Sequence, residues 1–399
     1  MKSIIEESKK IKDWLIAIRR DLHKHPELGM QEVRTSKKIC EYLDEMNIPY
    51  ESNVANTGVV GLIKGKYKGP TIALRADMDA LPIQDGKDKS YKSENYGIMH
   101  ACGHDAHTTI LLGTAKTLIK MKDQIHGNIK LLFQPAEETV GGAKPMIEEG
   151  VMENPTVDAV FGLHVDSSLD TGKIGIKYNQ MNAASNMIEI NIYGNASHGA
   201  YPQNGVDAIL IASHVVVALQ SIVSRNVSPI DSSVVTIGKI IGGTQGNIIA
   251  DKVTLIGTVR NINEDTRNEV MKRIQDIVEM IPKPFGGKGE LIKIDGYRSL
   301  VNDDEMVDVV SHSVKKILGE NNLAHIKEPS LGVEDFSYFA AEKPSAFFTL
   351  GCRNLEKGIE GHAHHPLFDI DEECLPIGVA IHVSNVLEAL DRMTNNKHK

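Results

Sequence analysis

The spacing of apolar residues predicts two helices at the start of the chain, followed by alternating strands and helices. Apolar side chains recur at helical spacing at Ile11, Trp14, Leu15 and Ile18, and the segment 36–46 repeats the pattern. Short apolar runs then predict strands at residues 59–63, 71–75, 129–134 and 159–164, with helices at 108–121 and 142–149. This alternation predicts an α/β sheet with helices on both faces.

A second pattern begins near Ala184. Strand, long helix, two strands, helix and strand are predicted in turn at residues 187–193, 205–224, 233–241, 252–261, 265–280 and 288–294. This β-α-β-β-α-β order is the ferredoxin-like α+β arrangement and forms a complete small unit. We therefore expect an inserted domain at 184–296. The flanking parts, 1–183 and 297–399, form the first domain, which the helix at 305–318, the strand at 346–350 and the helix at 375–393 should complete.

Composition narrows the function classes. The 399 residues are 41% hydrophobic and carry a net charge of -9, which leaves no basic stripe for a nucleic acid. The apolar segment 208–223 contains four polar side chains and is short for a bilayer, so we expect a packed helix and no membrane association. The first thirty residues lack a signal pattern, and four scattered cysteines fit a reducing compartment, so we expect a cytoplasmic protein.

The stretch 100–107 is the richest in chemistry, because it holds a thiol, three imidazoles and a carboxylate. Thiolate and imidazole are ligands for zinc and other borderline metals. Cys102 and His104 are therefore candidate ligands. The alternative is a polar loop in which Asp105 caps the helix predicted from Thr108.

Other candidates follow predicted strands. Glu137 and Glu138 come after one strand, and adjacent residues there point in different directions, so one can bind metal while the other faces a water. The alternative for Glu137 and Glu138 is a solvated acidic pair on the surface, and the alternative for Asp77 and Asp79 is an ordinary turn. Because ligand-binding residues collect at the carboxyl ends of strands in open α/β sheets, the set favours one site. Its remaining members are Asp77, Asp79, His164, His362, His364 and His365.

Seven segments, in this order and spacing, resemble the aminoacylase/carboxypeptidase metallopeptidases over nearly the whole chain. The resemblance is to the branch of N-acyl-L-amino acid amidohydrolases, hippurate hydrolases and auxin-conjugate hydrolases. The segments are HKHPELGMQE, ALRADMDALPI, MHACGHDAHTT, FQPAEE, FGLH, HGAYPQNGVDA and HHPLFDIDEE.

The resemblance implies a two-metal site and a general base. Glu137 would be the base. His364 is preferred to His365 because the ligand lies two residues before the proline, here Pro366. Asp77 is our choice for a supporting catalytic carboxylate, with Asp79 left open as the alternative. The implied metal ligands are Cys102, His104, Glu138, His164 and His364.

The resemblance also implies that the inserted domain is a lid through which the chain forms a homodimer. His198 would reach the substrate, across the subunit interface in dimeric relatives, and Asn247 and Arg260 would bind it. Asn247 could instead be a turn residue, and Arg260 could simply pair on a strand surface.

The implied reaction is metal-dependent hydrolysis of small N-acyl-L-amino acids by a metal-bound water. The two divalent ions would be zinc or manganese, with cobalt or nickel possible. The alternatives are a dipeptidase, an N-acetyl-diaminopimelate deacetylase, a cysteine hydrolase using Cys102, and a catalytically silent binding protein.

Overall fold

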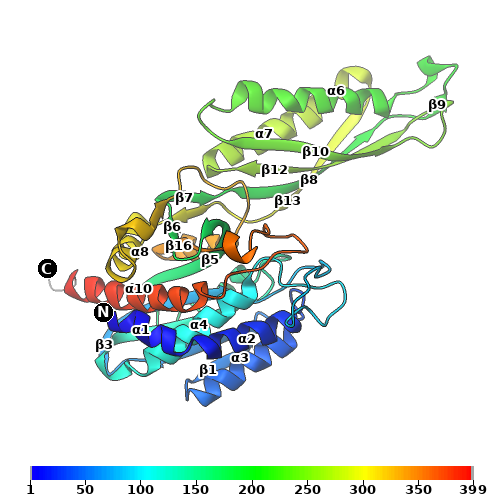
Figure 1. Cartoon of the computed structure of the whole chain (residues 1–399). Helices are drawn as coiled ribbons and strands as arrows, with labels where there is room; N and C mark the ends of the chain where they lie inside the picture. Colours follow the sequence, from blue (N-terminus) through cyan, green and yellow to red (C-terminus); the bar gives the residue numbers. More distant parts are fainter. Residues whose placement is uncertain (1, 397–399) are drawn as a thin grey trace. The chain divides into compact units, whose positions relative to one another are not determined.

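The computed structural model describes residues 2–396, which form two compact units (Figure 1). The first unit holds the described residues up to Asn179, Val301–Glu328 and those from Asp335 onward. The second holds Gln180–Leu300 and Pro329–Glu334. The sequence pattern predicted this inserted domain at 184–296, and the main range of the second unit is Gln180–Leu300. Pro329–Glu334, which the sequence pattern assigned to the first domain, belongs to the second unit.

The first unit is built on an eight-stranded mixed sheet of order β1-β2-β4-β3-β5-β16-β6-β15. The four middle strands, from β4 to β16, are parallel, and both edges include antiparallel pairs. The strands are β1 (Tyr50–Val54), β2 (Gly58–Lys64), β3 (Tyr67–Asp77), β4 (His126–Gln134), β5 (Ala159–Asp170), β6 (Ile174–Ile176), β15 (Leu323–His325) and β16 (Ser345–Arg353).

Helices cover both faces of this sheet, because the side chains of the central strands are buried on each side. In β5, Phe161 and Leu163 join the main core with residues of α4 and α10, whereas Gly162 on the opposite face lies against Phe336, next to α9. The predicted α/β fold is confirmed. The helices are α1 (Lys2–Lys10), α2 (Lys12–Lys24), α3 (Val33–Glu45), α4 (His104–Ile119), α5 (Ala143–Glu148), α8 (Asp304–Ile317), α9 (Ser337–Glu342) and α10 (Cys374–Asn396).

The second unit is a four-stranded antiparallel sheet of order β10-β12-β8-β13 with two helices. Along the chain its elements run β8, α6, β10, β12, α7, β13, which is the predicted ferredoxin-like order. The helices and the strands they cover share a separate apolar core. The elements are β8 (Ala184–Tyr193), α6 (Ala208–Ser221), β10 (Ser233–Gly242), β12 (Lys252–Asn261), α7 (Glu264–Met280) and β13 (Lys288–Asp295), with the small pair β9 (Ser197–His198) and β11 (Ile248–Ile249).

The parallel strands bring the candidate residues to one edge of the first sheet. Asp77, the last residue of β3, lies opposite Gln134, the last residue of β4. Arg75 lies opposite Gly162, so His164, two residues further along β5, reaches the same level as Asp77. Register alone therefore places three chemistry-bearing strand ends side by side.

Candidate metal centre

Helix α4 begins within the 100–107 stretch rather than after it. The predicted start was Thr108, but the helix runs from His104, and Gly103 before it has a left-handed backbone with φ of 93°. A side chain at Gly103 would also meet Val165 at 2.3 Å, so only glycine fits there. His104 thus projects from a rigid first turn, while Cys102 lies just outside it.

The five predicted ligands lie together. The Sγ atom of Cys102 is 3.3 Å from Nε2 of His164, and Nε2 of His364 is 3.0 Å from Oε1 of Glu138. Ligand atoms lie within 4.8 Å of one another in each of three groups: Cys102 with His104 and His164, Cys102 with Glu138 and His364, and His104 with Glu137 and Glu138. Cys102 thus belongs to two groups that differ in their histidine, which is the arrangement expected of two neighbouring ions.

The donors fit divalent cations on a further ground. Nε2 of His104 is buried and has no hydrogen-bond partner among residues 2–396, although it lies 3.9 Å from Oε1 of Glu138. A buried ring nitrogen left without a partner is costly, and a cation supplies one. Thiolate, imidazole and carboxylate together suit zinc and its neighbours in the transition series.

Asp79 and Asp77 occupy different positions behind this group. Oδ1 of Asp79 lies 3.1 Å from Nδ1 of His104, and its Oδ2 accepts the backbone N–H of Glu138 at 3.0 Å. Asp77 instead lies 2.6 Å from Nδ1 of His107 and accepts a bond from Arg75 at 2.7 Å. Asp79 therefore contacts two of the predicted ligands, whereas Asp77 lies 3.7 Å from Nε2 of His104 and is held by Arg75 and His107. The catalytic role of Asp77 stays a prediction.

Two of the predicted ligands, His104 and Cys102, hold protons that a cation would displace. Burial lowers the pKa of His104, but Asp77 and the bond to Asp79 outweigh it and raise that pKa well above the ordinary value. Burial, followed by the Glu138 charge, raises the pKa of the Cys102 thiol. Burial lowers the pKa of His164 to about 3, which leaves its ring neutral near pH 7.

A strained turn carries the two glutamates. Ala136 has φ of 56°, a left-handed conformation that costs a non-glycine residue free energy. Its N–H donates to Oε1 of the buried Glu32 at 2.9 Å, and a side chain at Gly29 would meet its Cα at 3.0 Å. The turn places Glu137 and Glu138 after β4, where both offer a carboxylate oxygen to the group with His104. Glu32 lies in the quoted HPELGMQE segment, yet its contact with Ala136 spans 104 residues and gave no sequence signal.

The remaining predicted site residues belong to the second unit. His198 in β9 is exposed and lies opposite Ile248, and the N–H of Gly199 donates to the carbonyl of Asn247 at 2.8 Å. Arg260 in β12 is partly buried, and burial lowers its pKa. His198 and Asn247 are therefore neighbours in space.

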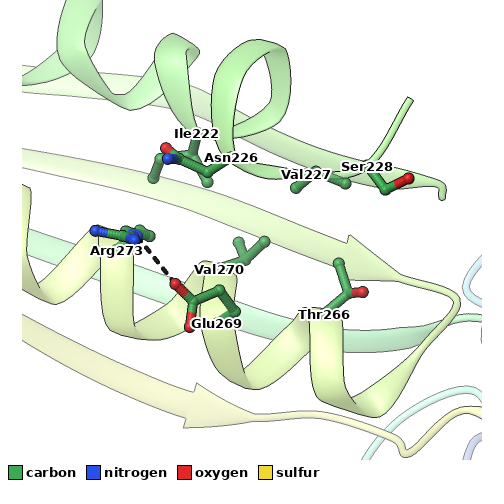
Figure 2. A pocket seen from close by; sticks show the side chains of 8 residues that line it. All are labelled: Ile222, Asn226, Val227, Ser228, Thr266, Glu269, Val270 and Arg273. Atoms are coloured by element: carbon green, nitrogen blue, oxygen red, sulfur yellow. Dashed lines mark hydrogen bonds and ion pairs between the residues drawn. The ribbon is translucent and has the colours of Figure 1, made fainter. Parts of the chain in front are cut away.

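The second unit also has a small pocket beside α7, drawn in Figure 2. Its volume of about 70 Å³ is well below the roughly 300 Å³ of the smaller ligand pockets. The ion pair between Arg273 and Glu269 at 3.0 Å crosses its wall. None of the potential metal-binding groups found among the described residues lies there.

Comparison with known proteins gives several long matches. Thermostable carboxypeptidase 1 of Saccharolobus solfataricus is 40% identical over 378 residues, covering 94% of this chain and 95% of that protein. IAA-amino acid hydrolase ILR1-like 4 of Arabidopsis thaliana is 40% identical, covering 93% and 84%. N-acetyl-L-cysteine deacetylase of Bacillus subtilis is 41% identical, covering 90% and 84%.

Solved structures agree with these relatives. A putative aminohydrolase from methicillin-resistant Staphylococcus aureus has a TM-score of 0.93 at 38% identity, covering 98% of this chain and all of that chain (100%). The Bacillus subtilis YXEP protein, described as a dinuclear metal-binding peptidase, has a TM-score of 0.84 at 33% identity, covering 96% and 99%. Residues 73–388 match the peptidase family M20/M25/M40, and the chain belongs to that family.

Proposed function

We propose that this chain is a metal-dependent amidohydrolase that cleaves the amide bond of N-acyl-L-amino acids. The observation that carries the proposal is the cluster in which His104, Glu137 and Glu138 form one group and Nε2 of His104 has no hydrogen-bond partner among residues 2–396. The relatives named as hydrolases of an amino-acid conjugate and of an N-acetyl amino acid support the substrate class.

Two divalent cations would be held by Cys102, His104, Glu138, His164 and His364. When bound, they would polarise the substrate carbonyl and lower the pKa of a water. Asp79 would fix both His104 and the backbone of Glu138, as carboxylates behind metal ligands do. A thiolate ligand favours zinc, with manganese, cobalt and nickel as the other ions to test.

Glu137 is the proposed general base. Its carboxylate would take a proton from the attacking water and pass it to the nitrogen of the leaving amine, which is how one carboxylate serves as base and then as acid. His198 would donate a hydrogen bond to the carbonyl oxygen as the lid closes. Arg260 and Asn247 would bind the substrate, and the partly buried guanidinium suits the amino-acid carboxylate.

A panel of substrates tests the reaction class. Purified protein loaded with zinc, manganese, cobalt or nickel is given N-acetyl, N-benzoyl and indole-acetyl amino acids, N-acetyl-diaminopimelate and dipeptides, with and without chelator. We expect chelator-sensitive amine release from N-acyl amino acids. Because one relative is named a carboxypeptidase, faster cleavage of dipeptides is the alternative outcome, and it would replace the proposed substrate.

We also propose that the second units form a homodimer. Two segments, Ala208–Asn226 and Cys374–Asn395, are apolar enough to cross a membrane by length and composition. In the apolar 18-residue stretch of each, 33% and 78% of the residues are buried, respectively. Exposed apolar side chains include Ile209 and Val217 on α6 and Ile240 on the edge strand β10. A hollow of about 440 Å³ lies between α6 and β10. A second copy would cover this apolar face.

Mixing two inactive variants tests the dimer and the position of His198 together. If His198 acts across the interface, Glu137→Ala and His198→Ala chains combined into one dimer regain part of the activity, because one site then has both residues intact. A monomer by light scattering, or mixed dimers without activity, would contradict the interface or the role in trans.

A further inference from the structure

His107 is the third histidine of the 100–107 stretch and is not among the proposed ligands, yet its ring is held on every side. It is 2% exposed. Nδ1 lies 2.6 Å from Oδ1 of Asp77, and Nε2 accepts the backbone N–H of Val165 at 2.9 Å. The ring centroid lies 4.6 Å from that of His164 in an edge-to-face contact. His107 therefore touches a proposed ligand, and both of its ring nitrogens already have partners in the chain.

These contacts fix which nitrogen of His107 carries the proton. A backbone N–H can only donate, so Nε2 must present its lone pair to Val165. The ring proton is then on Nδ1 and is donated to Asp77. Asp77 accepts it because its other oxygen is bound by the fully buried Arg75 at 2.7 Å.

The position at which His107 contacts β5 explains why the strand needs it as a hydrogen-bond acceptor. The pairing of β3 with β5 reaches only to Arg75 opposite Gly162, so β5 has no strand beside it on that side at Val165. His107 supplies the missing acceptor. The carbonyl of the same Val165 accepts Nδ1–H of His164 at 2.7 Å. The lone pair of His164 is then on Nε2, which lies 3.3 Å from Sγ of Cys102.

We propose that His107, oriented by Asp77, is a positioning residue that holds β5 at Val165 and so aims the ring of His164 at its cation. The inference rests on the proposed two-metal site. It also gives Asp77 a role in setting the tautomer of His107.

Three substitutions separate the contacts. His107→Gln places an amide oxygen near the position of Nε2 and keeps an acceptor for Val165. His107→Asn keeps a partner for Asp77 but leaves the Val165 N–H without an acceptor. In Asp77→Asn the single oxygen goes to Arg75, so the amide donates to His107 and forces its proton onto Nε2, against the Val165 N–H.

Metal binding measured without substrate is the readout. Metal-free protein is titrated with Co²⁺ against a chromophoric chelator, and the visible spectrum of the bound ions is recorded. We expect His107→Asn and Asp77→Asn to weaken one of the two ions about 10- to 100-fold, as loss of a ligand's supporting partner does, and to shift its cobalt spectrum. His107→Gln should stay near wild type in both respects.

His382→Gln is the matched control, because His382 is equally buried, lies on α10 against Phe348, and has no hydrogen-bond partner for Nδ1 among residues 2–396. Its cobalt affinities should be unchanged. If His107→Asn and His107→Gln bind both ions alike, the positioning role is wrong while the two-metal function stands. If the wild type binds no pair of ions, the proposed function fails first, and the two failures are thus distinguished.

Discussion

Replacing Glu32 with alanine removes the acceptor that holds the turn bearing Glu137. Oε1 of Glu32 accepts the N–H of Ala136 at 2.9 Å, and Oε2 accepts the hydroxyl of Thr57 at 2.6 Å. Ala136 is fully buried, so its N–H would lose the acceptor that Glu32 provides and would not gain one from solvent. We predict that the Glu32→Ala variant is less stable and also slower.

The magnitude follows from two terms. A buried donor left without a partner costs about 1 to 3 kcal/mol, so the free energy of unfolding should fall by about 2 kcal/mol. The left-handed backbone of Ala136 stores about 1 to 2 kcal/mol of strain, which the turn can release once the anchor is gone. If relaxation of the turn releases about 1.4 kcal/mol, the left-handed turn that positions Glu137 becomes about tenfold less populated than the relaxed one. The kcat should fall by a similar factor.

The assay compares kcat and urea unfolding for Glu32→Ala, Glu32→Gln, Ala136→Gly and the double variant Glu32→Ala/Ala136→Gly. Glutamine keeps both hydrogen bonds and should stay near wild type. Glycine removes the strain, so the double variant should recover part of the kcat lost in Glu32→Ala. If Glu32→Ala loses stability but keeps its kcat, the turn does not depend on this anchor.

Further predictions concern the ligands, protons and the buried charges. Asp79→Asn should weaken metal binding about 10- to 100-fold by calorimetry, because one amide oxygen cannot serve both His104 and the Glu138 N–H; unchanged affinity would remove Asp79 from this role. Because the pKa of metal-free His104 is raised, metal uptake should release protons, and affinity should fall as pH drops below that raised pKa; calorimetry in buffers of different ionisation enthalpy measures the release, and none would count against His104 as a ligand. Burial alone would raise the pKa of Asp105, but Arg19 and His23 outweigh it and hold that pKa well below the ordinary value. The resulting stability is present above the unfolded pKa of about 4 and is lost as pH falls below it. The free energy of unfolding measured with urea should therefore fall from pH 5 toward pH 2. Asp105→Asn should cost about 3 to 5 kcal/mol at pH 7 and flatten this dependence; an equally steep acid profile in the variant would assign the acid sensitivity elsewhere.

The elements with strong periodicity were predictable from the sequence. Strands β3, β4 and β5 are apolar runs, and the order of the second unit follows from its alternating pattern. Strand β1 (Tyr50–Val54) was not predicted, because its middle residues are polar and exposed and its pairing with β2 defines it. The short strands β6 and β15 likewise depend on partners distant in sequence.

At the site, too, local properties were predictable and contacts between distant residues were not. Residue types in the 100–107 stretch made Cys102 and His104 candidates, and the position after a strand did so for Glu137 and Glu138, because those properties are local. The supports were not local: Glu32 reaches Ala136 across 104 residues, and His107 reaches Val165 across 58. Only the folded structure could distinguish Asp77 from Asp79, because Asp77 ends strand β3 and Asp79 follows it by two residues.

The most direct test of the proposed chemistry compares wild type with Glu137→Gln on the N-acyl amino acid that the wild type cleaves best. Both proteins are loaded with the same metal, and metal content and substrate binding are measured beside kcat. We predict that Glu137→Gln keeps both cations and loses about 10²- to 10⁴-fold in kcat, because glutamine cannot accept the proton. A Glu137→Gln enzyme that turns over as fast as wild type with both cations bound would contradict the assignment of Glu137 as the base.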